Sequence, residues 1–149
     1  MWTIVSWSTL PAPGSGAEKE RESFMSRCGD TMCSSSAMCS ITDTEKGIIN
    51  IYAETLMFQS VDWAALTIYL EKWDDKNEKW STVEIFEREF TPADKEDGKL
   101  NSVELSISVG TQPAGYYYRI RCIHELEYDN GWYEAKSTKT DGVLLTNIK

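Results

Sequence analysis

The sequence predicts an all-β fold, an antiparallel two-sheet sandwich of about seven strands of the immunoglobulin-like kind. Apolar and polar residues alternate along the chain from Met38 onward, which is the pattern of half-buried strands. Segments rich in Gly, Pro, Asn and Asp interrupt this alternation at regular intervals, as turns do in sandwiches. No window long enough for a helix places apolar residues at spacings of three and four.

The alternation places the individual strands. We expect strands over 38–44, 47–55, 65–73, 80–90, 100–110, 116–128 and 132–140, followed by a short last segment over 143–148. In the segment 100–110, Val103, Leu105, Ile107 and Val109 point one way and polar residues point the other. One polar face per strand favours antiparallel sheets whose outer faces are exposed to solvent.

The 149 residues favour a single domain, and the first 17 differ from the rest. They contain no charged side chain and pass from apolar residues into small ones, with Ser15 and Ala17 at the spacing that precedes signal cleavage. We therefore expect a signal-peptide remnant over 1–17, a lead-in segment over 18–37 and the sandwich over 38–149, in a secreted protein. The alternative is a flexible extension on a cytosolic protein.

Four cysteines in a small chain with an export-like start suggest disulfides, and three connectivities are possible. We favour a local Cys28–Cys33 bond and a long-range Cys39–Cys122 bond. The second would close a loop of more than eighty residues, which the chain-entropy model values at roughly 4–5 kcal/mol. A zinc site is less favoured because the spacing is wide and the chain has one histidine, so no metal or other cofactor is expected.

The charge balance restricts the partners. The chain has 24 acidic and 15 basic residues, which give a formal net charge of −9. Nucleic acid and anionic membranes both require a positive surface, so neither is an expected partner. Apolar runs are also too short for membrane insertion. The acidic loops at 74–75 and 94–98 leave a calcium site as an alternative, although neither has EF-hand spacing.

Aromatic residues beside predicted loops are the first candidate binding residues. Trp73 and Trp80 flank one predicted hairpin loop, and Trp132 follows the Asn-Gly turn of another. Exposed Trp side chains stack on sugar rings or anchor protein interfaces. The alternative interpretation is that cross-strand aromatic pairs only stabilise the hairpins, each by roughly 0.2–1 kcal/mol.

A second candidate surface lies in the strand over 116–128. Alternation places Tyr116 and Tyr118 on one face and turns Tyr117 outward beside Arg119 and Arg121. These three residues form a short cationic and aromatic stripe on an otherwise acidic protein.

No catalytic residue is assigned from the sequence. His124 and Glu125 are neighbours in a strand and point to opposite faces, so they cannot act together as a base and its orienting carboxylate. The chain contains no G-x-S-x-G nucleophile motif. His124 is therefore interpreted as a hydrogen-bonded sheet residue.

The segment PAGYYYRIRC resembles the penultimate strand of immunoglobulin-like and fibronectin-type sandwiches, where a tyrosine bonds back to the backbone at the sheet corner. Tyr116 or Tyr118 would take that role. The chain departs from antibody-type domains because the second-strand cysteine is absent and Cys122 lies four residues beyond Tyr118.

A wider resemblance covers residues 27–146. The segments RCGDTMC, GIINIYAET, YLEKWD, KEDGKL, PAGYYYRIRC, GWYEAK and TKTDGVLL are together similar to a family of small exported proteins from Gram-positive bacteria, known only as a domain of unknown function. The resemblance implies export and a β-rich fold, and it assigns no catalytic residue.

These observations favour a non-catalytic extracellular domain that recognises a protein or a glycan through its loop aromatics. The alternative is a structural or stress-related cell-envelope protein without a specific ligand, and a small secreted hydrolase comes third. Glycan binding predicts that Trp73, Trp80 or Trp132 is exposed, whereas a purely structural role predicts buried tryptophans.

Overall fold

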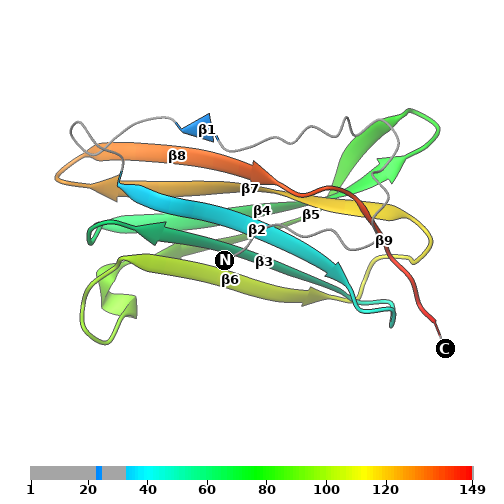
Figure 1. Cartoon of the computed structure of the whole chain (residues 1–149), viewed down its shortest axis with the longest axis horizontal. Coiled ribbons are helices and arrows are strands. Elements are labelled where there is room, and N and C mark those ends of the chain that lie inside the picture. Colours follow the sequence, from blue (N-terminus) through cyan, green and yellow to red (C-terminus); the bar gives the residue numbers. More distant parts are fainter. Residues whose placement is uncertain (1–22, 25–32, 149) are drawn as a thin grey trace.

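The computed structural model describes residues 23–24 and 33–148, and the predicted all-β fold is confirmed (Figure 1). The described strands are β1 (Ser23–Phe24), β2 (Ser34–Asp43), β3 (Ile49–Met57), β4 (Trp63–Asp74), β5 (Lys79–Phe90), β6 (Ser102–Val109), β7 (Tyr117–Tyr128), β8 (Trp132–Lys139) and β9 (Val143–Leu144). One short 3-10 helix, η1 (Pro92–Asp94), lies between β5 and β6. The predicted signal-peptide remnant over 1–17 lies outside the described residues.

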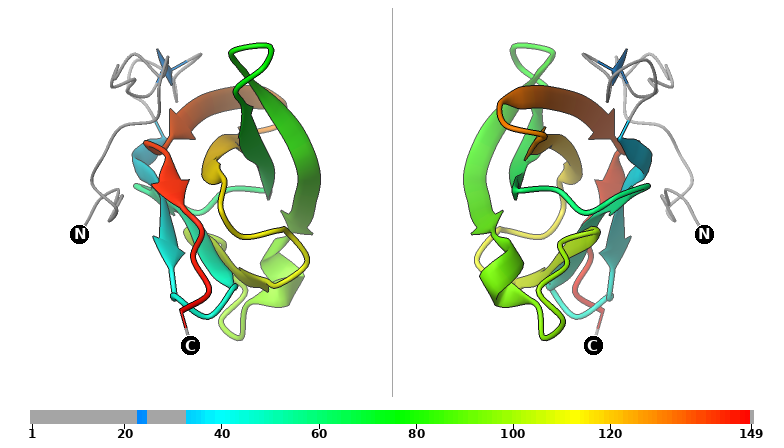
Figure 2. Two further views of the ribbon diagram at one scale, coloured as in Figure 1. Left: turned by 90° about the vertical axis from the view of Figure 1, so that its right-hand side faces the viewer. Right: turned by 90° about the vertical axis from the view of Figure 1, so that its left-hand side faces the viewer.

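The strands form two antiparallel sheets. One has the order β1-β8-β7-β4-β5, with β9 paired to the start of β7, and the other has the order β2-β3-β6. Seen end-on, the sheets curve around a shared interior (Figure 2). When β2 to β8 are lettered A to G, the sheets are A-B-E and D-C-F-G. This differs from a constant-type immunoglobulin domain only in the sheet that the fourth strand joins.

The core lies between the two sheets, on the faces that the alternation predicts. Ile49, Ile51 and Ala53 of β3 are buried, and they face buried residues of β4 and β7 across the sandwich. The largest fully buried apolar side chains come from both sheets and from the segments beside them, namely Ile41, Ile49, Ile51, Leu66, Ile68, Leu70, Leu100, Ile120, Leu126 and Leu145. Burial of this apolar area is the main favourable contribution to the stability of the domain.

The sandwich begins earlier than the sequence predicts. Strand β2 starts at Ser34 and not at Met38, because its first residues pair with the end of β3 and are held by a side chain of β8. The carboxylate of Glu134, itself buried, accepts hydrogen bonds from the backbone N–H groups of Cys33 and Ser34 and from the Ser34 hydroxyl. Three consecutive serines, Ser34 to Ser36, gave no alternation from which this start was predictable.

A tyrosine corner fixes the beginning of β7, as the resemblance to immunoglobulin-like sandwiches implied. The Tyr118 hydroxyl donates a hydrogen bond of 2.6 Å to the carbonyl oxygen of Pro113. Burial raises the pKa of Tyr118 to about 12. Of the two tyrosines considered for this role, Tyr118 takes it, and Tyr116 instead lies outside the core with 45% of its surface exposed.

A β-bulge changes which face the first residues of β5 present. Leu70 pairs with Glu84 and Glu71 pairs with Thr82, so Val83 is passed over in the register between β4 and β5. An extra residue reverses the alternation of side chains on either side of it. Trp80 therefore lies on the outer face, although Phe90 on the same strand belongs to the core.

Candidate functional site

The two tryptophans of the β4–β5 hairpin pack against each other and do not form an exposed platform. Trp73 and Trp80 are direct partners across the hairpin, and their rings meet edge to face with centroids 5.3 Å apart. Trp73 is 7% exposed and Trp80 is half-buried. For Trp73 the structure corrects the expectation of an exposed loop aromatic, since cross-strand packing removes the ring from solvent.

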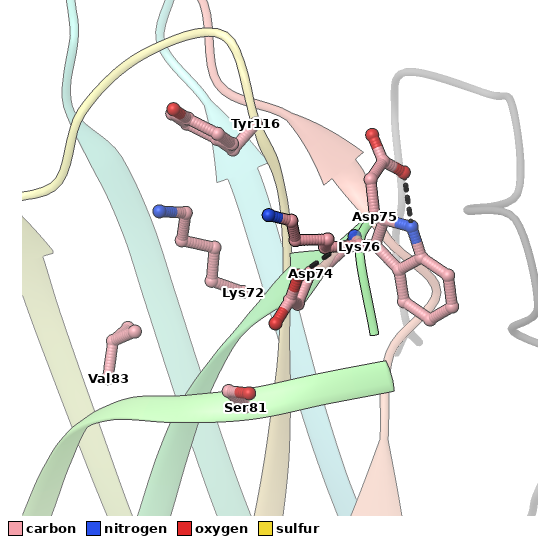
Figure 3. A pocket seen from close by; sticks show the side chains of 8 residues that line it. Lys72, Asp74, Asp75, Lys76, Ser81, Val83 and Tyr116 are labelled. Carbon is pink, nitrogen blue, oxygen red and sulfur yellow. Dashed lines mark hydrogen bonds between the residues drawn. The ribbon is translucent and has the colours of Figure 1, made fainter. Parts of the chain in front are cut away.

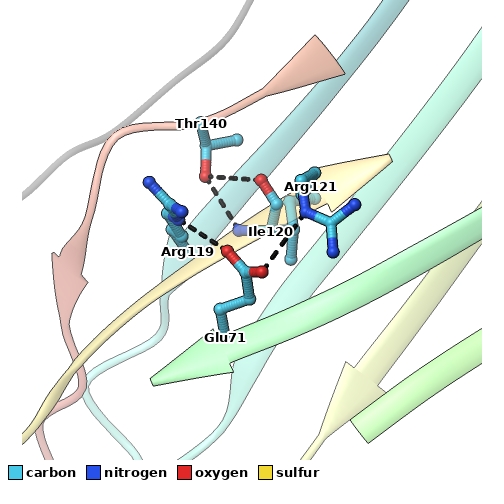
Figure 4. Close-up of polar contacts among 5 residues, drawn as sticks. All are labelled: Glu71, Arg119, Ile120, Arg121 and Thr140. Atoms are coloured by element: carbon cyan, nitrogen blue, oxygen red, sulfur yellow. Dashed lines mark hydrogen bonds and ion pairs between the residues drawn. The ribbon is translucent and has the colours of Figure 1, made fainter. Parts of the chain in front are cut away.

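Two arginines and one glutamate connect β7 to this hairpin (Figure 4). Glu71 accepts a hydrogen bond of 2.7 Å from Nε of Arg119 and one of 3.3 Å from Nε of Arg121. The Arg119 guanidinium lies over the Trp80 ring and the Arg121 guanidinium over the Tyr69 ring, at 4.5 and 4.2 Å from the ring centroids. These stacked cations contribute cation–π attraction in addition to the ion pairs.

We call this group the arginine–tryptophan cluster, defined as Tyr69, Glu71, Trp73, Trp80, Arg119 and Arg121. The two candidate surfaces that the sequence predicts separately are thus largely one cluster on the outer face of the larger sheet. Tyr117 lies two residues before Arg119 on the same strand face and is half-buried, with its backbone paired to Leu144 of β9. The buried position of Glu71 shows that the cluster is a packed, structural contact.

A pocket lies on the opposite face of the same hairpin (Figure 3). The β4–β5 hairpin projects from the body of the sandwich, as the end-on views show (Figure 2). Lys72 and Asp74 continue the inner face of β4 after buried Leu70, and at this end of the strand the inner face is open. The resulting cavity has a volume of about 450 Å³ and is lined by Lys72, Trp73, Asp74, Asp75, Lys76, Ser81, Val83 and Tyr116. We call it the hairpin pocket.

Tyr116 forms the aromatic wall of the hairpin pocket. The Lys72 ammonium nitrogen lies 3.8 Å from the centroid of the Tyr116 ring. Backbone hydrogen bonds on both sides hold this ring in place: Gly115 N–H donates to Leu145, and Leu145 N–H donates back to Tyr116. Gly115 has a φ of +94°, a conformation that glycine adopts without strain. The ring is therefore carried on an ordered turn.

The loop between β6 and β7 is further anchored to the edge strand β5. Glu84 accepts hydrogen bonds from the Thr111 hydroxyl and from the Gln112 side-chain amide, at 2.6 and 2.8 Å. Together with the tyrosine corner, these bonds fix both ends of the loop that presents Tyr116 to the pocket.

The carboxylates at the pocket already have partners within the hairpin turn. Asp74 accepts hydrogen bonds from the backbone N–H groups of Lys76 and Asn77 and from the Asn77 amide, and these bonds hold its pKa below the usual value. Asp75 accepts a hydrogen bond of 2.8 Å from the Trp73 indole. Such turn bonds are typical of Asp and do not require calcium.

Among the tryptophans of residues 33–148, Trp132 is the exposed one, at 52% of its surface, and it lies far from the pocket. It pairs with Tyr128 at the end of β7, whereas the pocket lies at the beginning of that strand. The predicted turn before it is confirmed, with positive φ at Asp129, Asn130 and Gly131. The structure does not bring Trp132 together with the other candidate binding residues.

The single histidine is part of a buried polar chain between the sheets, as the sequence led us to expect. His124 is 2% exposed, and its two ring nitrogens lie 2.8 Å from the hydroxyls of Thr55 and Thr138. Burial, with a smaller contribution from the charge of Lys136, lowers the pKa of His124 to about 3. His124 is therefore neutral at physiological pH, and both of its ring nitrogens have hydrogen-bond partners within the core.

The expected Cys39–Cys122 disulfide is not formed, and both residues are free, buried thiols. They are nevertheless neighbours: Cys39 accepts a hydrogen bond from the Thr138 hydroxyl, and burial followed by the contact with Cys39 raises the pKa of Cys122. Cys33 is disulfide-bonded, while Cys28 of the predicted local bond lies outside the described residues. The sequence thus predicted the proximity of Cys39 and Cys122 but not their thiol state.

Comparison of the chain with protein-family models, with curated proteins and with solved structures gave no match. The resemblance to small exported proteins of Gram-positive bacteria therefore stays a prediction. In the part of the chain that the structure describes, no helix has the length and apolar character to cross a membrane.

Sequence reasoning missed the residues that make the pocket. Lys72, Ser81 and Val83 carry no motif, and Tyr116 was expected on the core-facing side of its strand. The available signal was position: Tyr116 follows the Pro-Ala-Gly turn and precedes the first paired residue of β7, where alternation no longer implies burial.

Proposed function

We propose that this protein is a non-catalytic, extracellular saccharide-binding domain whose site is the hairpin pocket. The observation that carries the proposal is the half-exposed Tyr116 ring, held on an ordered turn beside the ammonium group of Lys72. An aromatic face with polar groups around it is suited to a sugar, whose ring presents apolar C–H groups and hydroxyls together.

The size of the hairpin pocket favours a small or terminal sugar unit over a protein surface. Its volume of about 450 Å³ falls in the range of roughly 300–1,000 Å³ that is typical of small-molecule sites. Lys72, Lys76 and Ser81 supply hydrogen-bond donors, and Val83 adds an apolar contact. Protein interfaces are flatter and larger.

The proposal of a binding role without catalysis is supported by the state of the acidic groups. Glycoside hydrolysis needs two carboxyl groups facing the sugar across roughly 5–10 Å. Asp74 and Asp75 instead accept hydrogen bonds from the turn and from Trp73. The single histidine is hydrogen-bonded in the core, away from the pocket.

An extracellular location is the second part of the proposal. Its support is the export-like composition of residues 1–17 and the participation of Cys33 in a disulfide. The alternative of a purely structural envelope protein is favoured by the burial of Trp73, and the binding experiment below distinguishes the two.

The proposal is tested by calorimetric titration of the purified chain with a panel of soluble neutral and acidic oligosaccharides. We expect micromolar to millimolar binding of at least one of them and a loss of about tenfold or more in Tyr116→Ala, because the stacking face is removed. Trp132→Ala is the matched control, since this exposed aromatic lies at the other end of the sandwich.

Either of two results would contradict the proposal. Absence of binding across the panel would favour the structural envelope role. A loss of binding in Trp132→Ala with Tyr116→Ala unaffected would move the site to the β7–β8 hairpin.

A further inference from the structure

The hairpin pocket contains two cationic side chains, Lys72 and Lys76, although the chain carries a net charge of −9. Ion pairs among the described residues are limited to those of Glu71 with Arg119 and Arg121, on the other face of the sheet. Neither Lys72 nor Lys76 makes an ion pair within that part of the chain. Both ammonium groups are therefore available to a ligand.

Two acidic side chains, Asp74 and Asp75, also line the pocket, and their oxygens already accept hydrogen bonds within the hairpin. Both oxygens of Asp74 accept hydrogen bonds from the turn. Oδ1 accepts from the backbone N–H groups of Lys76 and Asn77, and Oδ2 accepts from the Asn77 side-chain amide. The side chain of Asp75 points away from Lys72 and Tyr116 and toward the Trp73 indole (Figure 3). Lys72, Lys76 and Ser81 are the pocket residues that can donate hydrogen bonds to a ligand.

Lys72 is the better positioned of the two lysines. Its ammonium nitrogen lies over the Tyr116 ring, 3.8 Å from the ring centroid, so that its charge is held at the aromatic wall of the pocket (Figure 3). The cation–π contact restricts the long side chain before any ligand arrives, which reduces the entropy lost on binding.

From this arrangement we infer that the hairpin pocket recognises an acidic saccharide, with Lys72 binding the carboxylate of a uronic acid unit whose ring packs against Tyr116. A charge-assisted hydrogen bond to a carboxylate is stronger than one to a neutral hydroxyl. Lys76 supplies a second cation from the exposed turn. The inference rests on the proposed function and names the substrate class of the same site.

The experiment compares tetragalacturonate with its fully methyl-esterified form, in which each carboxylate is a neutral methyl ester, by calorimetric titration at low ionic strength. The wild-type chain should bind the acid about tenfold or more tightly than the ester. Lys72→Met should remove this preference, so that the acid and the ester bind with similar affinity, because the charge that distinguishes them is lost. Lys99→Met is the matched control, an equal change of charge on an exposed lysine of the β5–β6 loop.

The outcomes separate failure of the inference from failure of the proposed function. If the two probes bind equally and Lys72→Met changes nothing, the acidic specificity is wrong and the saccharide site stands. If neither probe nor any neutral oligosaccharide binds, the proposed function fails and the inference with it. If a tetraglutamate peptide binds through Lys72 while saccharides do not, the ligand is an acidic protein segment and the inference is overturned.

Discussion

The ammonium nitrogen of Lys72 lies 3.8 Å from the centroid of the Tyr116 ring, joining the end of β4 to the residue that precedes β7. The two side chains belong to segments that the sequence separates by more than forty residues. Their contact depends on the loop before β7, which the tyrosine corner and the hydrogen bonds of Glu84 hold in place. Stability of this end of the sandwich and the proposed ligand binding should therefore be connected.

Tyr118→Phe removes the hydrogen bond from the tyrosine hydroxyl to the Pro113 carbonyl. We expect it to lower the free energy of unfolding by about 1–2 kcal/mol, because a part-buried acceptor loses its donor. Urea denaturation followed by circular dichroism measures the change. Tyr117→Phe is the matched control, and its free energy of unfolding should stay within about 0.5 kcal/mol of the wild type. Equal effects of the two variants would mean that the Tyr118–Pro113 hydrogen bond does not stabilise the fold.

Glu71→Gln places an amide against two guanidinium groups and leaves both arginines without a counter-charge. We expect a loss of about 2 kcal/mol in unfolding free energy, because the glutamate is buried and Arg119 is largely so. Glu87→Gln, an exposed position on β5, provides the control and should change stability little. A Glu71→Gln chain as stable as the control would mean that cation–π packing alone holds the cluster.

Stability should fall as the pH drops below the ordinary pKa of histidine. Burial lowers the pKa of His124 from 6.5 to about 3 in the folded chain, so unfolding takes up a proton between these values. The linkage relation gives a loss of about 2 kcal/mol between pH 7 and pH 5 from this one group. Carboxylates contribute further losses at lower pH, near their own pKa values.

The variant His124→Asn isolates the histidine contribution. Asparagine cannot take up a proton, so the difference in stability between pH 7 and pH 5 should shrink by about 2 kcal/mol relative to the wild type. The measurement is urea denaturation at both pH values. An unchanged pH dependence in the variant would mean that His124 is protonated in the folded state as well, contrary to its buried, doubly hydrogen-bonded position.

The neighbouring thiols of Cys39 and Cys122 predict a disulfide when the chain folds under oxidising conditions. Each thiol loses a proton and an electron, and an oxidised glutathione molecule is reduced to two thiols. Folding in a glutathione redox buffer should give the bond, detected by peptide mapping, and add roughly 4–5 kcal/mol to stability. The folded, reduced chain should react slowly because both sulfurs are buried.

Cys122→Ala is the control for this oxidation and should show no such gain in stability. Two thiols that remain free after folding in the oxidising buffer would show that the inter-sheet geometry does not permit the bond.

Much of the fold was predictable because alternation directly reflects burial. The inward positions of Ile49 and Ile51 on β3, and of Leu66 and Ile68 on β4, followed from the period of two that a half-buried strand requires. The tyrosine corner was predictable in kind from the PAGYYYRIRC segment. These features depend on local sequence patterns, so they can be predicted from one sequence alone.

The candidate site was less predictable because it depends on where alternation stops. The bulge at Val83 turns Trp80 to the outer face, and nothing in the segment WSTVEIFEREF marks the extra residue. Tyr116 lies outside the core because it precedes the first residue of β7, where alternation no longer implies burial. The contact between Lys72 and Tyr116 depends on how far each strand extends in the folded domain, which the local sequence does not indicate.

The central claim is that a ligand occupies the hairpin pocket, and the most direct measurement is a ¹H–¹⁵N NMR titration of the full chain with tetragalacturonate. We predict chemical-shift changes concentrated at the backbone amides of Lys72, Lys76, Ser81 and Tyr116, with the amides around Trp132 unchanged. Shifts confined to the Trp132 end, or no shifts at millimolar saccharide, would contradict the claim.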